Sequence, residues 1–96
     1  MAMQQLDVAH LEREGTVLLI VFVPPETAYF DDVQRVKLRD ILIKALLTHH
    51  LSGELVAVWE QDGAPHFLGR SRWSDFIKKT GYQGLYTQRN AHISVT

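Results

Sequence analysis

The longest apolar run of the chain extends from Val17 to Val23, and with Thr16 before it this forms the stretch at residues 16–23. It is rich in β-branched residues and apolar at both alternating sets of positions, so it predicts a strand that is buried on both faces of a sheet. The stretch is far shorter than the about 20 residues that a membrane-spanning helix needs. Pro24 and Pro25 follow it. Because proline has no N–H to donate to a neighbouring strand, we expect the strand to end there.

A helix is predicted next, with Thr27 or Asp31 as its N-cap and with its end near His50, before the stop signal Ser52-Gly53. Its apolar residues are spread well beyond one stripe. One side carries Val33, Val36, Ile41 and Leu47, and the broader remainder carries Leu38, Leu42, Ala45 and Leu46. A helix this broadly apolar must be covered on more than one side. The cover is either the short helix predicted near the C-terminus or a second copy of the chain.

Shorter patterns predict four more strands. Alternation of apolar and polar residues indicates strands over residues 6–11, a modest signal, and 91–96, and apolar residues indicate further strands over 54–61 and 66–68. Glu14-Gly15 is expected to form a turn, and Asp62-Gly63 is expected to turn a hairpin between the strands at 54–61 and 66–68.

A second, shorter helix is predicted after Gly69. Ser71 is the expected cap, with Trp73, Phe76 and Ile77 facing inward and Gly81 ending the helix. Residues 82–90 lack a clear period and are predicted to form a loop, with a short extended piece at residues 85–87.

The expected order is β-β-α-β-β-α-β, an α+β fold with a mostly antiparallel sheet and two helices. Without the weak first strand, the order is that of a ferredoxin-like sandwich, which places both helices on one face of the sheet. In that arrangement the second face of the strand at 16–23 stays uncovered. The sequence then implies either dimerisation through the open face or a different topology.

Length and composition favour one domain spanning residues 1–96, which is long enough to bury its own core. The chain has no cysteine, which excludes a disulfide scaffold, a thiolate zinc site and a thiol nucleophile. A reducing cytoplasm is therefore the expected location. The first residues lack the basic and apolar regions of a secretory signal, and no membrane association is expected.

Charge is distributed unevenly along the chain. Residues 1–66 hold five Lys and Arg against ten Asp and Glu, a net charge of −5, whereas residues 67–96 hold five against one, a net charge of +4. Such polarity either steers a charged partner or reflects two segments that neutralise each other in space.

The candidate site is an anion site in the basic C-terminal third. Gly69-Arg70-Ser71-Arg72 lies between a predicted strand and a predicted helix, where backbone amides and two arginines can bind a phosphate or carboxylate. Lys78, Lys79 and Arg89 are expected to steer the anion, and Tyr82 or Tyr86 to stack on it. Basic groups beside aromatic rings are typical of sites for single-stranded nucleic acid.

The same residues also have simpler interpretations that involve no ligand. Trp73 is expected in the core, and the arginines either stay solvated or pair with the acidic part of the chain. The five histidines, His10, His49, His50, His66 and His92, show no metal-binding spacing and are expected to be ordinary surface or half-buried residues, so neither a metal nor a cofactor is predicted. No serine lies in a nucleophile elbow.

The sequence thus predicts a small cytoplasmic interaction module, dimeric through its apolar surface, that docks an anionic partner such as single-stranded nucleic acid, a phosphorylated ligand or an acidic protein. The alternative is a homodimeric structural or regulatory domain with no nucleic-acid role. A small enzyme that uses histidine acid–base chemistry is a third reading.

Overall fold

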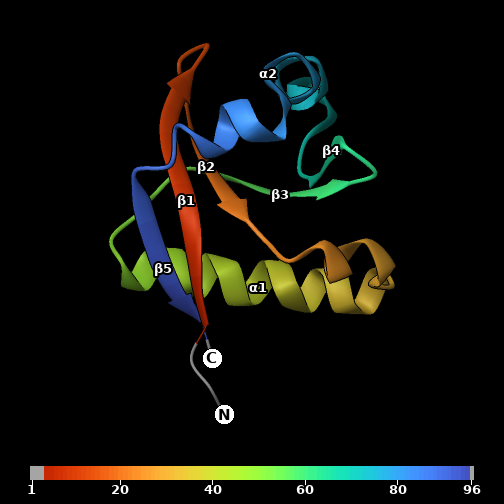
Figure 1. Ribbon diagram of the computed structural model, residues 1–96. Coiled ribbons are helices and arrows are strands. Elements are labelled where there is room, and N and C mark those ends of the chain that lie inside the picture. The colour runs from red at the N-terminus through yellow and green to blue at the C-terminus, as the bar shows by residue number, and fades with distance from the viewer. Residues whose placement is uncertain (1–3, 96) are drawn as a thin grey trace.

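The computed structural model describes residues 4–95, which form five strands, two α-helices and two short 3₁₀ helices (Figure 1). The elements are β1 (Gln4–Arg13), β2 (Thr16–Phe22), η1 (Pro25–Tyr29), α1 (Asp32–Thr48), β3 (Glu54–Gln61), β4 (Ala64–Leu68), η2 (Ser71–Trp73), α2 (Ser74–Tyr86) and β5 (Ala91–Val95). The predicted order of strands and helices is confirmed. Thr96, the last residue of the predicted C-terminal strand, lies outside the described residues.

The five strands form one mixed sheet in the order β4-β3-β2-β1-β5. Strands β1 and β2, β1 and β5, and β3 and β4 pair antiparallel, whereas β2 and β3 pair parallel through the crossover helix α1. The weak strand signal at residues 6–11 belongs to β1, which lies inside the sheet. The ferredoxin-like arrangement is not confirmed, because β2 and β3 are direct neighbours and β1 is a full member of the sheet.

The two helices cover opposite faces of the sheet (Figure 1). On one face, Leu42, Ala45 and Leu46 of α1 pack into an apolar cluster with Leu19 and Val21 of β2. On the other face, α2 and η2 pack against the alternate residues of the same strand. The prediction that β2 is buried on both sides is therefore confirmed, and it is a different topology, rather than dimerisation through an open sheet face, that covers its second side.

Two tight turns join the hairpins. Glu14-Gly15 connects β1 to β2 and Asp62-Gly63 connects β3 to β4, and all four residues have positive φ. This is the geometry of type I′ turns, whose twist matches that of the paired strands. Both predicted turns are confirmed.

Helix α1 begins with a capping box. The Asp31 carboxylate accepts the Gln34 backbone N–H, and the Gln34 side chain accepts the Asp31 N–H. Of the two predicted N-cap candidates, Asp31 is therefore the one that caps α1, whereas Thr27 is buried in η1. The predicted cover by the second helix was wrong: within residues 4–95 the outer side of α1 stays uncovered, and Val33, Val36, Ile41 and Leu47 are exposed. Cover by a second copy of the chain stays a prediction.

Helix α2 continues beyond the predicted stop. Gly81 has φ 75° and ψ 161°, a conformation open mainly to glycine, and the helix resumes after it as far as Tyr86. The loop predicted for residues 82–90, with its extended piece at 85–87, was therefore wrong over residues 82–86. Leu85 is fully buried on the sheet, and this long-range packing holds the second segment. Ser71 makes no side-chain cap, because η2 leads directly into α2.

None of the helices in residues 4–95 has the length and apolarity needed to cross a membrane.

Candidate functional site

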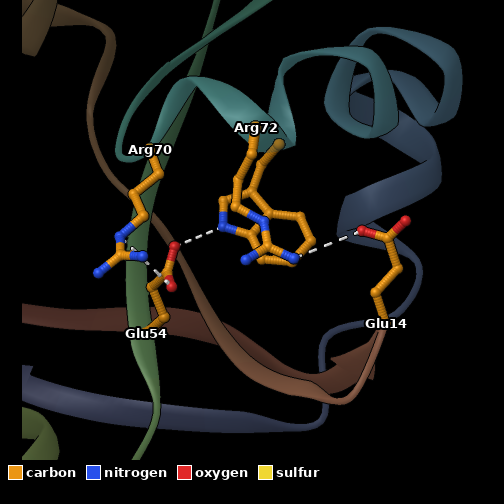
Figure 2. A network of polar contacts seen from close by, with 5 residues as sticks. Glu14, Glu54, Arg70 and Arg72 are labelled. Carbon is orange, nitrogen blue, oxygen red and sulfur yellow. Dashed lines mark hydrogen bonds and ion pairs between the residues drawn. The ribbon is translucent and has the colours of Figure 1, made fainter.

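The predicted anion turn lies where β4 passes into η2, and its arginines are engaged by carboxylates. Arg70 Nε lies 3.8 Å from Glu54 Oε1, and one Arg72 Nη lies 3.7 Å from Glu14 Oε2 (Figure 2). Glu54 begins β3 and Glu14 belongs to the β1–β2 turn. Both arginine side chains are largely exposed, so these ion pairs add little to stability.

Trp73 links the two ion pairs. Its indole Nε1 donates to Glu54, while the Arg72 guanidinium carbon lies 4.4 Å from the centre of its ring (Figure 2). Trp73 is only 1% exposed, which agrees with the interpretation of Trp73 as a core residue. The buried Trp73 indole thus holds one oxygen of the Glu54 carboxylate, and the other oxygen lies near Arg70.

Gly69 does not open the backbone to a ligand. A Cβ built at Gly69 would lie 3.3 Å from Val56 Cγ2 and 3.5 Å from the Leu55 carbonyl oxygen. Glycine at this position lets the end of β4 pack closely on β3, which is a structural use of the residue.

The steering residues lie apart from the turn. Lys78 and Lys79 are exposed on α2, whereas Arg89 follows α2 and reaches Asp7 of β1 at 4.0 Å. Each of the three ion pairs formed within residues 4–95 joins an arginine of the basic C-terminal third to a carboxylate of the acidic part. This is the arrangement in which the two parts of the chain neutralise each other.

Tyr82 and Tyr86 stack on each other rather than standing free. Their ring centres are 5.9 Å apart and nearly parallel, and Phe22 meets both rings edge-on. The Arg89 guanidinium lies 4.1 Å from the centre of the Tyr86 ring, and the Tyr86 hydroxyl donates to Asp7. Burial, followed by the nearby Tyr86, raises the pKa of Tyr82. These contacts occupy much of the ring surface that a stacked base would need.

A groove on the opposite face of the sheet brings Arg70 of the predicted site together with two arginines that the sequence did not point to, Arg35 and Arg39. It lies between α1 and the β3–β4 edge and has a volume of about 660 Å³, within the range of small-molecule sites. Its charged lining consists of Arg35 and Arg39 of α1 together with Arg70 and Glu54, which pair with each other. Its apolar lining comes from Val36, Leu38, Leu42, Ile43, Leu55, Ala57 and Leu68.

Arg35 and Arg39 are one helical turn apart, and neither forms an ion pair with a carboxylate of residues 4–95. Like charges at this spacing repel each other. Arg35 Nε donates to the Phe30 carbonyl oxygen at 3.1 Å, which holds its side chain toward the start of α1 and leaves its other N–H donors available. The available sequence signal was the i, i+4 spacing of the two arginines. Asp31 and Asp32 precede Arg35 by four and three positions, so the same pattern also fits a solvated helix face.

Two of the histidines, His49 and His66, contact different parts of the chain. His49 accepts the Ser94 backbone N–H at its Nε2, and His66 stacks on Trp59 with ring centres 6.0 Å apart. No group of three or more His, Asp or Glu side chains suited to a metal ion occurs in the described part of the chain.

Comparison of the chain with known proteins finds no matching family model, no matching curated protein and no matching solved structure. A function must therefore be argued from the geometry of the chain itself.

Proposed function

We propose that the protein is a cytoplasmic interaction module that docks an anionic ligand in the groove between α1 and the β3–β4 edge. The observation that carries the proposal is the pair of arginines, Arg35 and Arg39, beside an apolar cavity of about 660 Å³. Anions bind most strongly where guanidinium groups are already held in place and lack carboxylate partners.

The groove is a better anion site than the turn at residues 69–72. Arg70 and Arg72 are already paired with Glu54 and Glu14, so an incoming anion must displace a carboxylate from each. Arg35 and Arg39 form no ion pair among the described residues, since Glu54 of the same groove pairs with Arg70, and a bound anion relieves their mutual repulsion. Arg70 belongs to both sites, at the rim where they meet.

The tyrosine cluster argues against single-stranded nucleic acid as the preferred ligand. Tyr86 is already in contact with Tyr82, Phe22 and Arg89, so stacking of a base on it would require these contacts to separate. The groove, in contrast, offers cations next to aliphatic side chains, which suits an anion with an apolar part.

Replacing Arg35 and Arg39 together by alanine is expected to weaken anion binding about tenfold or more, because each charge-assisted hydrogen bond contributes about 1.5–3 kcal/mol. Amide NMR titration at low salt, with inorganic phosphate and separately with a short single-stranded oligonucleotide, measures the effect. For phosphate, we expect shifts near residues 35–39, 53–55 and 68–70 that diminish as salt is added.

The matched control is Lys37→Ala with Lys44→Ala, which removes the same charge from the same helix away from this groove. The control should bind phosphate nearly as well as the native chain. Shifts confined to residues 69–72 and 78–89 would move the site to the predicted turn. A chain that shows no shifts with either anion would contradict anion docking altogether.

A second candidate function is homodimerisation through the outer side of α1. Val33, Val36 and Leu47 are each at least 60% exposed there, a large apolar surface for a helix. Asp40 lies between Lys37 and Lys44 along the same helix. In an antiparallel pair of α1 helices centred near Leu42, Asp40 of each copy would face Lys44 of the other.

Light scattering over a dilution series tests this candidate. We expect a dimer at high micromolar concentration and a monomer for the Val33→Lys, Leu47→Lys double variant, because each lysine places a charge in the interface. Gln83→Lys, an exposed position on α2, should leave the dimer intact. A native chain that stays monomeric at high micromolar concentration would exclude self-association through α1.

A further inference from the structure

We infer that the groove takes an amphipathic monoanion, an alkyl chain with one carboxylate head, whose head lies at Arg35 and Arg39 and whose chain lies along the apolar floor. The inference rests on the proposed function, since it specifies the ligand of the same groove. Its grounds are the placement of the charges and the apolar residues around the groove.

The head is assigned to the Arg35 and Arg39 end because Arg70, which also lines the groove, is already paired with Glu54. Glu54 shares its side of β3 with Val56 and Val58, which pack in the cluster on the α2 face of the sheet. Trp73 holds Glu54, and Arg70 Nε lies 3.8 Å from the other Glu54 oxygen, so a carboxylate offsets the charge of Arg70 (Figure 2). The groove is left with two unpaired cations, both on α1.

Two adjacent guanidinium groups match one carboxylate. Each guanidinium has N–H donors in a planar fork, and a carboxylate has two oxygens with about four acceptor positions. One anionic head can thus bridge Arg35 and Arg39. The Nε contact of Arg35 with the Phe30 carbonyl oxygen limits the motion of that side chain, so less conformational freedom is lost on binding.

The floor of the groove is aliphatic. Leu42 and Ala57 are buried, while Leu38, Leu55 and Leu68 are half-buried members of the same cluster, so their free surface faces the groove. Helix α1 returns from the end of β2 to the start of β3 (Figure 1). When the carboxylate head lies at Arg35 and Arg39, the alkyl chain can therefore extend along the floor of the groove toward Leu55. When an alkyl chain covers this floor, apolar surface of both the protein and the ligand is removed from water.

The test is a calorimetric titration with hexanoate, octanoate and decanoate, each below its micelle concentration, together with octanol and octylamine. The affinity should rise about two- to fourfold for each added methylene, because the chain is buried along the floor. Octanoate should bind at least about tenfold more tightly than octanol, and octylamine should bind most weakly.

Variants separate the head from the chain. Arg35→Gln with Arg39→Gln should reduce the affinity for octanoate to that of octanol and leave octanol binding unchanged, while Lys37→Gln with Lys44→Gln should change neither. Thermal unfolding of each variant verifies that the fold is intact. If octanol and octanoate bind the native protein with equal affinity, the carboxylate head does not bind at Arg35 and Arg39, and the inference is overturned.

Failure of this inference is distinguishable from failure of the proposed function. If phosphate and hexanoate shift the amides of residues 35–39 but affinity does not change from hexanoate to decanoate, the amphipathic ligand is excluded and anion docking stands. If neither phosphate nor any carboxylate binds, both are excluded.

Discussion

Replacing Trp73 by alanine is expected to lower the free energy of unfolding by about 3–5 kcal/mol, the range for deletion of a buried aromatic side chain. Trp73 is 1% exposed and packs among the residues that cover the α2 face of the sheet. Its loss also removes the indole donor that holds Glu54. Because small domains are stable by only about 5–15 kcal/mol, we expect a large shift of the urea midpoint, measured by circular dichroism.

Two further variants calibrate this result. Trp73→Phe keeps most of the apolar packing and loses the hydrogen bond to Glu54, so it should cost less than Trp73→Ala. Tyr29→Ala removes an aromatic ring that is 82% exposed and should change the free energy of unfolding by no more than about 0.5 kcal/mol. Equal costs for Trp73→Ala and Tyr29→Ala would show that Trp73 is not a core residue.

Replacing Leu85 by alanine is expected to cost about 2–5 kcal/mol, the range for a buried leucine. Leu85 lies in the helical segment that follows Gly81, is fully buried, and packs with Ile20 and Phe22 of β2. The measurement is again equilibrium unfolding in urea. It tests the part of α2 for which the sequence predicted a loop.

Leu47→Ala is the matched control, since it truncates the same side chain at a position that is 62% exposed. It should change the free energy of unfolding by no more than about 0.5 kcal/mol. If Leu85→Ala is equally mild, residues 82–86 do not pack on the sheet. Tyr82 and Tyr86 would then be free to stack on a base, which would restore the nucleic-acid alternative.

The candidate site was only partly accessible to sequence reasoning. The turn at residues 69–72 was located correctly between a strand and a helix, but the partners of Arg70 and Arg72 come from Glu54 and Glu14, far away in sequence. Which carboxylate pairs with an arginine depends on which strand ends lie beside it in the folded protein. The residues next to the arginine in the sequence do not specify these neighbours.

The groove was out of reach for the same reason. Arg35 and Arg39 lie on a helix among other charged residues, and the pattern fits a solvated surface equally well. They become site candidates only because α1 leaves the β3–β4 edge uncovered and Leu68 of β4 completes the floor. That arrangement depends on the angle at which α1 crosses the twisted sheet.

The sequence by itself determined the features that depend on near neighbours. These are the positions of the two turns, the start of α1 at one of two capping candidates, the double burial of β2 and the order of the elements. Their signals lie within a few residues, because turn geometry, capping and alternation are local. Only the tertiary structure decided the sheet order, the placement of the helices on opposite faces and the helical state of residues 82–86. Each of these depends on burial against residues distant in the chain, such as that of Leu85 against Phe22, and such packing overrides local propensity.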